Sequence, residues 1–169
     1  MTAGLVGEPM PLTGPELSES AFRRACAQFP TGVTVVTAAH AGDLHGSTVN
    51  AFSSLTLAPA QVLVCLARTS RTWPAIERSR RFAVNVLARD QVDVARLFAT
   101  KEPDKLARVP HRSDDGAPPV LHGAAAWFEC DLADAITSHT HRIVIGRVVR
   151  LMVDEDRDPL VFARGRLDG

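Results

Sequence analysis

A series of short apolar runs, separated by turn residues and brief helical patterns, constrains this chain more than any other feature. The runs are rich in β-branched residues or alternate apolar and polar positions, which is typical of strands. They occupy residues 33–39, 47–52, 61–67, 82–87, 127–133, 141–153 and 160–164. Gly146 favours a β-bulge in the longest run. Many strands with only short helices between them predict a mainly β fold, a barrel with peripheral helices, and not a doubly wound α/β sheet.

Three short segments carry the period of an amphipathic helix. Their apolar positions are Phe22, Cys26 and Phe29 in the first, Trp73 and Ile76 in the second, and Val94, Leu97 and Phe98 in the third. Either the Thr13-Gly-Pro-Glu16 segment or Ser18 is expected to cap the first segment, and Asp90 the third. Pro30 ends the first segment. No G-x-G-x-x-G follows any predicted strand, which argues against a Rossmann site.

The length of 169 residues predicts one globular domain at residues 18–169, preceded by a flexible arm at residues 1–17. A formal net charge of zero gives no indication of nucleic-acid binding. We expect no membrane span and no signal peptide, because no apolar run is long enough and no basic segment precedes one. The polar stretch at residues 101–119 is a long loop, which is typical of a functional segment or a cover.

Cysteine usage predicts a cytoplasmic protein. The three cysteines, Cys26, Cys65 and Cys130, are far apart in the sequence and form no C-x-x-C motif. We therefore expect all three to be reduced residues of the core.

The segment at residues 46–59 indicates where a ligand binds. It combines small hydroxyl residues with an asparagine and leads into the apolar run at residues 61–68. It offers backbone N–H groups and short side-chain donors with little bulk, which suits a flat ligand with polar edges. The candidate donors are Thr48, Asn50, Ser53 and Ser54. The same residue types are also typical of a plain turn between strands.

Six short motifs follow one another along most of the chain. They are Phe29-Pro-Thr-Gly-Val33, Thr48-x-Asn-Ala-Phe-x-Ser54, Val64-Cys-Leu-Ala67, Arg81-Phe-Ala-Val-Asn-Val-Leu87, Phe98-Ala99 with Asp104-Lys-Leu106, and His141-x-Ile-Val-Ile-Gly146. In this order they resemble the short-chain flavin reductases, which are the reductase components of two-component flavin monooxygenases.

This resemblance implies a split β-barrel of Greek-key type that forms a homodimer. It implies reduction of FMN or FAD by NADH or NADPH, with hydride passing from the nicotinamide to the flavin. The reduced flavin then diffuses to a partner monooxygenase. Two alternatives remain open: an enzyme that retains its flavin and acts on an organic substrate, and a flavin-binding protein without enzymatic activity.

The resemblance also selects site residues. His141 is the expected catalytic residue, near the nicotinamide. The expected flavin-binding residues are Thr31, Gly32, Thr48, Val49, Asn50, Ala51, Ser53, Ser54, Cys65, Leu66, Ala67, Ser70, Arg71, Phe98 and Lys105. Among these, Gly32 lets the backbone approach a ring, and Ser70, Arg71 and Lys105 face a phosphate.

The chain departs from the family pattern at two places. His139 and Thr140 stand where Gly-Asp often precedes the catalytic histidine, so the carboxylate that would orient His141 is missing. The chain has no tyrosine, and Phe162 keeps the bulk of an aromatic residue without its hydroxyl. His139 and His141 could face a metal together, but no third ligand is evident and we expect no metal.

Overall fold

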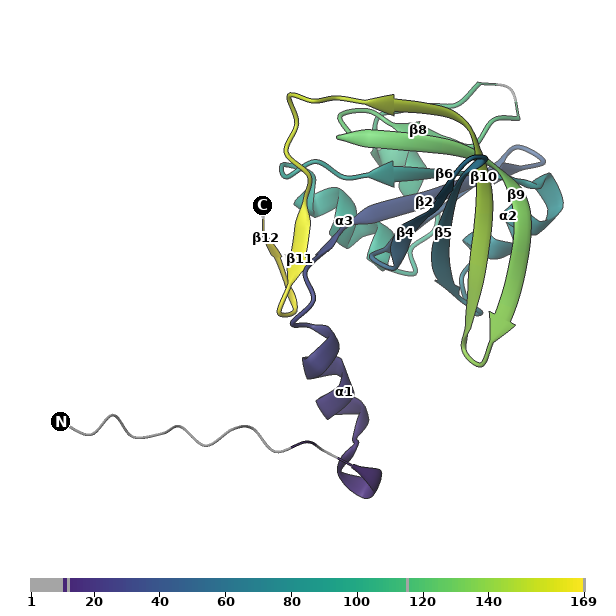
Figure 1. The fold of residues 1–169 in the computed structure, drawn as a ribbon. Helices are drawn as coiled ribbons and strands as arrows, with labels where there is room; N and C mark the ends of the chain where they lie inside the picture. The colour runs from purple at the N-terminus through teal and green to yellow at the C-terminus, as the bar shows by residue number, and fades with distance from the viewer. Residues whose placement is uncertain (1–10, 12, 115, 169) are drawn as a thin grey trace.

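Seven strands form one antiparallel sheet, in the order β3-β2-β6-β9-β10-β5-β4 (Figure 1). The computed structural model describes residues 11, 13–114 and 116–168. The strand bounds are β2 Thr34–His40, β3 Asp43–Val49, β4 Phe52–Leu57, β5 Ala60–Ala67, β6 Arg81–Val86, β9 Ala126–Ser138 and β10 His141–Val153. Three hairpins, β2–β3, β4–β5 and β9–β10, make up most of this sheet, with β6 between the first and the last.

The two edge strands of this sheet are neighbours in the sequence. β3 ends at Val49 and β4 begins at Phe52, so residues 50 and 51 alone join opposite edges. In a flat sheet these edges would lie roughly 29 Å apart, whereas the linker spans at most about 11 Å. The sheet therefore curls and brings its two edges close together at residues 50–51, although the described strands β3 and β4 do not pair with each other. The Cys65 N–H donates to the Ala51 carbonyl at 3.0 Å, which continues the β4–β5 pairing up to the linker. We call residues 49–52 the seam. An antiparallel sheet that curls in this way without closing agrees with the predicted split β-barrel.

Short helices and two small sheets surround the barrel (Figure 1). The helices are η1 Gly14–Glu16, α1 Glu19–Cys26, α2 Thr72–Ser79, α3 Val92–Ala99 and η2 Lys105–Arg108. The small sheets contain β1 Thr31–Gly32, β11 Val161–Ala163 and β12 Arg166–Asp168, and β7 His111–Arg112 with β8 Val120–Leu121. Among the described residues, no helix combines the length and hydrophobicity that crossing a membrane requires.

The barrel interior is an apolar core. Phe82 of β6 and Val144 of β10 are fully buried in it, and Trp73 and Ile76 of α2 pack against the same cluster, as the sequence predicts. Gly146 makes room for the Phe82 ring, because a Cβ at this position would overlap it. β10 shifts register beside Gly146, which confirms the predicted bulge.

A second core lies on the opposite face of β2. Val36 belongs to the barrel interior, whereas its neighbour Val35 packs with Phe98 of α3 and Leu106 of η2. This alternation buries both faces of β2 and seats α3 against the barrel. The loop that follows α3 therefore reaches the seam from a rigid base.

Two strand boundaries near the seam differ from the sequence prediction. β3 begins at Asp43 because Ala41 and Gly42 alone form the turn after β2, both with positive φ. Most of the segment at residues 40–46, which lies between two predicted strands, is therefore strand. The strand predicted at residues 47–52 is broken at the seam, and residues 52–57, most of which lie between two predicted strands, form β4.

The apolar stripe of the first helix is not buried. Phe22 is 62% exposed and Phe29, which lies beyond the end of α1, is 74% exposed. Cys26 is also exposed, so the prediction that all three cysteines are core residues is wrong for this one. Cys65 is half-buried and Cys130 is buried, and burial raises the pKa of the Cys130 thiol to about 12.

One of the two predicted helix caps is confirmed. The Ser18 hydroxyl accepts a hydrogen bond from the Ala21 N–H at the start of α1. Asp90 does not cap α3, because Gln91 occupies the N-cap position and Asp90 accepts a hydrogen bond from Arg157 instead.

Candidate functional site

A cavity of about 650 Å³ opens at the seam, and we call it the seam cavity. Its walls are the end of β3, residues 50–51, the end of β5, the start of β10 and the loop after α3. The curled sheet brings these segments together, since His141 at the start of β10 pairs with Ala67 at the end of β5. The predicted site residues in this wall are Thr48, Val49, Asn50, Ala51, Cys65, Leu66, Ala67, Ser70, Arg71, Phe98, Lys105 and His141.

Four other predicted residues lie outside the seam cavity. Thr31 and Ser53 line a neighbouring cavity of about 530 Å³, which shares residues 50–51 with it. Gly32 in β1 and Ser54 on the exposed edge strand β4 line neither cavity. A Cβ on Gly32 would meet no atom within 4 Å, so packing within this chain does not require glycine there. Contacts of these four residues with a flavin stay predictions.

Hydroxyl groups tie β3 to the helices beside the cavity. The Ser47 Oγ lies 2.8 Å from the Thr72 Oγ1 and 3.2 Å from the Ser70 Oγ, and the Thr72 N–H donates to Ser70 at 3.2 Å. The Thr48 hydroxyl donates to the Ala95 carbonyl of α3 at 2.7 Å. These bonds hold α2 and α3 in place around the seam. The sequence analysis did not identify Ser47 as a residue that connects β3 to α2.

Lys105 is bound to the end of α3. Its Nζ donates to the carbonyls of Phe98 at 3.0 Å and Thr100 at 2.9 Å, and lies 5.4 Å from the centre of the Phe98 ring. An ammonium group in this place satisfies carbonyls that the helix leaves without partners and suits the helix dipole. Burial, and then the charge of Arg71, lowers the pKa of Lys105. One of its three N–H donors is left for a ligand.

Phe98 supports the cavity from within the protein core. Its ring is 1% exposed, and a Cβ on Gly46 of β3 would overlap it. The close approach of the ring to the β3 backbone therefore depends on glycine at position 46. The ring fixes the start of the following loop, which carries Lys101 and Lys105 along the cavity wall.

His141 is exposed and has a partner that the sequence analysis did not foresee. The Thr140 Oγ1 lies 2.9 Å from the His141 Nδ1. Thr140 thus supplies a hydrogen bond to His141 in place of the carboxylate that the family pattern has and this chain lacks. The bond leaves Nε2 of His141 available for a ligand. His139 is in the left-handed region, and its carbonyl accepts a hydrogen bond from Arg68. His141, and not His139, lines the seam cavity.

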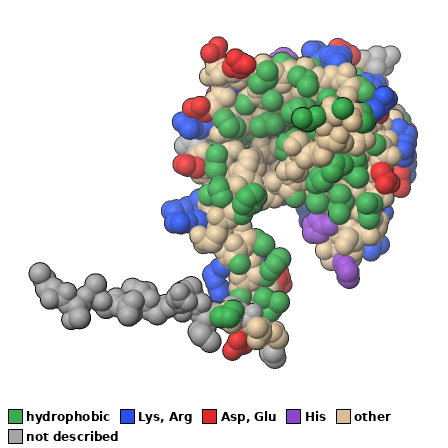
Figure 2. Space-filling model, viewed as in Figure 1, with side chains coloured by type: hydrophobic (Ala, Val, Ile, Leu, Met, Phe, Trp, Pro, Cys, Tyr) green, Lys and Arg blue, Asp and Glu red, His purple; other side chains and the backbone are tan. Residues whose placement is uncertain are grey.

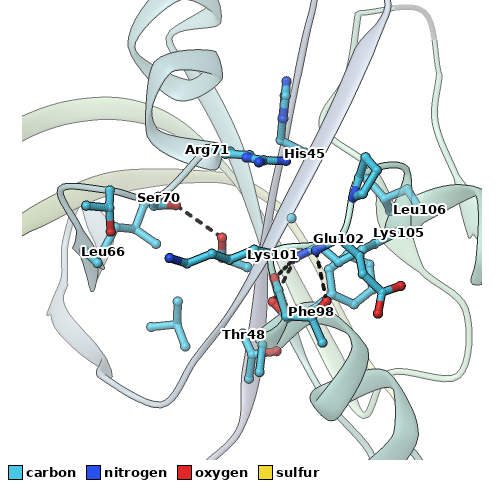
Figure 3. A pocket seen from close by; sticks show the side chains of 18 of the residues that line it. His45, Thr48, Leu66, Ser70, Arg71, Phe98, Lys101, Glu102, Lys105 and Leu106 are labelled. Atoms are coloured by element: carbon cyan, nitrogen blue, oxygen red, sulfur yellow. Dashed lines mark hydrogen bonds between the residues drawn. The ribbon is translucent and has the colours of Figure 1, made fainter.

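Basic side chains gather at the end of the cavity near α2. Arg71, Lys101 and His45 all line the cavity (Figure 3). Within the described ranges, none of the three forms an ion pair or a side-chain hydrogen bond. Sequence reasoning missed Lys101 and His45. The signal that could have found Lys101 is that it is one of only two lysines in the chain.

A curled antiparallel sheet with short peripheral helices and a cavity at its seam is a split barrel. The chain belongs to the family with a flavin reductase like domain, whose family model matches residues 26–169.

Relatives of this chain agree with the family. A flavin reductase of Pseudomonas putida is 40% identical over 88% of this chain and 88% of its own length. The reductase subunit HsaB of a flavin-dependent monooxygenase from Mycobacterium tuberculosis (strain CDC 1551 / Oshkosh) is 37% identical, over 91% of this chain and 83% of HsaB. The solved structure of the Streptomyces globisporus C-1027 NADH:FAD oxidoreductase SgcE6, in complex with NAD and FAD fragments, is similar with a TM-score of 0.85 and 31% identity. That match covers 94% of this chain and 95% of the other.

Proposed function

We propose that this protein reduces FMN or FAD with NADH or NADPH and supplies the reduced flavin to a partner monooxygenase. The observation that carries the proposal is the seam cavity, which unites most of the predicted flavin-binding residues in a chain of the flavin reductase family. The names of its relatives support both halves: one is a flavin reductase and another is the reductase subunit of a monooxygenase.

The residues of the seam cavity fit a flavin nucleotide. The Asn50 side chain is exposed and has no hydrogen-bond partner among the described residues, so its amide can both donate to and accept from the polar edge of the ring. Arg71 offers a forked donor for a phosphate. When bound, the two nucleotides supply the chemistry, in which hydride passes from the nicotinamide to the flavin. The chain contributes binding, orientation and exclusion of water.

We assign His141 to the nicotinamide side of the site. Its Nδ1 is engaged by Thr140, so its Nε2 is free to donate to a carboxamide when the neutral imidazole carries its proton there. We expect the protein to act in the cytoplasm, and its three free cysteines agree with a reducing compartment.

The first test is a titration of the purified protein with FMN, FAD and riboflavin, followed by measurement of NADH and NADPH consumption. We expect quenching of flavin fluorescence on binding and many turnovers per protein when free flavin is in excess. A protein that oxidises nicotinamide only in proportion to flavin it retains would instead support the enzyme that keeps its flavin. A yellow protein that oxidises neither nucleotide would support a binding protein.

We further propose that the protein is a homodimer. α1 projects from the barrel and carries exposed apolar residues, with Leu17 just before it at 59% exposure and Phe22 at 62% (Figure 1). Figure 2 shows apolar side chains on α1 and across the barrel face above it. The cavity beside the seam is also lined largely by apolar residues, including Phe29, Phe52 and Phe162. A second copy of the chain is the occupant that we propose for this surface.

The dimer proposal predicts that Phe22→Glu weakens self-association by at least about tenfold, because burial of a phenylalanine is worth about 1.5–3 kcal/mol. Sedimentation velocity over a range of protein concentrations measures this. Ser20→Glu on the same helix is the matched control, since it adds the same charge at a polar, exposed position. A wild-type protein that is monomeric at micromolar concentration would rule the dimer out.

A further inference from the structure

The residue after His141 is an arginine that faces the opposite side of β10. Arg142 pairs with Leu66 of β5, and successive side chains of a strand alternate between the two faces of the sheet. Arg142 therefore lies on the face of Val144, which is buried in the barrel interior, whereas His141 lines the seam cavity. Arg142 occupies the variable position of the motif His141-x-Ile-Val-Ile-Gly146, so the motif assigns no role to it.

The guanidinium group of Arg142 lies over an aromatic ring. Its Cζ is 4.6 Å from the centre of the Trp73 ring, and Trp73 of α2 is only 6% exposed. Arg142 is half-buried, yet among the described residues its guanidinium forms no ion pair and no hydrogen bond. A half-buried cation without an anion loses hydration, and the face of an indole ring offsets part of that cost. An apolar side chain would fill this place without the cost, so the arginine indicates a role for its contact with the ring.

This contact joins two walls of the seam cavity. The residues just before α2 include Ser70 and Arg71, which line the cavity, and Trp73 lies in the first turn of α2. His141 lines the cavity from the first position of β10. The end of a strand opens more readily than its centre. A contact between Arg142 and Trp73 therefore holds the end of β10 against α2 where an unsupported strand would fray.

A second arginine holds the other side of His141. The Arg68 backbone N–H donates to the Thr140 carbonyl at 2.9 Å, and the Arg68 guanidinium donates to the His139 carbonyl at 3.2 Å. The turn at residues 139–140 is thus fixed to the segment after β5, and Arg142 is fixed to α2. His141 is itself exposed and lies between these two fixed points. Loss of either one widens the range of positions that the imidazole can take.

We propose that Arg142 is a positioning residue for His141 and that it acts by stacking on Trp73. Arg142 lines neither the seam cavity nor the cavity beside it, so it acts through the backbone of β10 and not by contact with a nucleotide. The inference rests on the proposed function, because it takes His141 to be the residue that orients the nicotinamide. Hydride transfer depends steeply on the geometry of the two rings, so a less fixed imidazole slows it.

Arg142→Gln is expected to lower kcat/KM for NADH or NADPH by about two- to fivefold, the effect of losing one cation–π contact at a partly exposed site. Flavin affinity should change by less than about twofold, because Arg142 lines neither cavity. Arg142→Lys should recover part of the loss, since an ammonium group also stacks on an indole ring. Arg147→Gln is the matched control, because it removes an exposed positive charge from the same strand, where its partner is Asp131.

Combination with His141→Ala tests whether Arg142 acts through the histidine. If it does, Arg142→Gln has no further effect on kcat/KM once the imidazole is absent. An equal loss in the presence and in the absence of His141 would overturn the inference, since a residue that only stabilises the barrel would behave in that way.

Hydrogen exchange of the ligand-free protein gives a readout that does not depend on turnover. In Arg142→Gln the amides of residues 138–142 should exchange faster than in the wild type, and in Arg147→Gln they should not. Unchanged exchange in Arg142→Gln would overturn the proposed contact between β10 and α2.

The wild type separates this inference from the proposed function. If the wild type oxidises neither NADH nor NADPH in the presence of free flavin, the proposed function is wrong and the inference loses its basis. If the wild type is active and Arg142→Gln has the same kcat/KM, the inference alone is wrong. Slow turnover by Arg142→Gln together with normal turnover by His141→Ala would also overturn it, because no histidine would then transmit the effect.

Discussion

Replacement of His141 by alanine is expected to lower kcat/KM for NADH or NADPH by about tenfold, with little change in flavin affinity. One orienting hydrogen bond is worth about 1–3 kcal/mol. We expect the lower end because the partner of His141 is the neutral hydroxyl of Thr140, 2.9 Å from Nδ1, and not a carboxylate. Steady-state nicotinamide oxidation at saturating flavin gives kcat/KM, and a fluorescence titration gives the flavin affinity of the same preparation.

Two further variants make this test specific. His139→Ala should have little effect, because His139 lies outside the seam cavity. Thr140→Val should reproduce part of the loss and Thr140→Ser should not, since serine keeps the hydroxyl. Normal turnover by His141→Ala together with impaired turnover by His139→Ala would show that His139, and not His141, has the role assigned here. If neither histidine mattered, the enzyme that retains its flavin and the non-enzymatic binding protein would become the better explanations.

Gly146→Ala is expected to destabilise the barrel by about 2–3 kcal/mol, the upper part of the range for overpacking a core. The new Cβ would overlap the Phe82 ring and crowd the Cβ of Cys130, and both residues are almost completely buried. For a domain of this size the melting temperature should fall by roughly 4–12 °C. Gly32→Ala is the matched control, because a Cβ there meets nothing within 4 Å. Thermal unfolding of the two variants side by side measures the difference, and a melting temperature of Gly146→Ala equal to that of the control would contradict the packing argument.

The barrel could be predicted because its strands and core helix follow local patterns. The alternation of Phe128 and Cys130 with Trp127 and Glu129 corresponds to the two faces of β9 in the structure, and Trp73 packs inward from α2. No local pattern predicts the break between β3 and β4 at residues 50–51. The break is set by strand pairing, because β3 and β4 pair at opposite edges of the curled sheet. Tertiary contacts of this kind override local propensity.

Other errors have causes outside the segment concerned. The stripe on α1 is apolar, but no other part of the described chain covers it. The periodicity of the segment predicts an apolar face and does not show whether that face is buried. Asp90 is a good capping residue, yet its carboxylate binds Arg157, 67 positions away in the sequence. A sequence pattern can identify an apolar face or a capping group, but it cannot identify the partner.

Most of the candidate site was predicted through motif order, and the structure adds what motifs do not contain. Lys101 and His45 lie outside the six motifs, so only the fold brings them to the cavity. Lys105 lies within one of the motifs, and its two carbonyl contacts could be seen only once α3 and the loop had been placed.

The junction of β3 and β4 also bears on how the barrel opens. β4 is held on one side by β5 alone, and the linker at residues 50–51 limits how far it can move away. A ligand that contacts β3, β5 and β10 at once connects the two edges of the sheet. It stabilises the curled barrel by an amount that grows with its concentration relative to its Kd. Protection of the β4 amides from hydrogen exchange would then depend on the flavin concentration. A reductase that releases its product at each turnover would be stabilised in this way only while a flavin is bound. The mobility of its edge strand β4 would therefore follow the flavin supply.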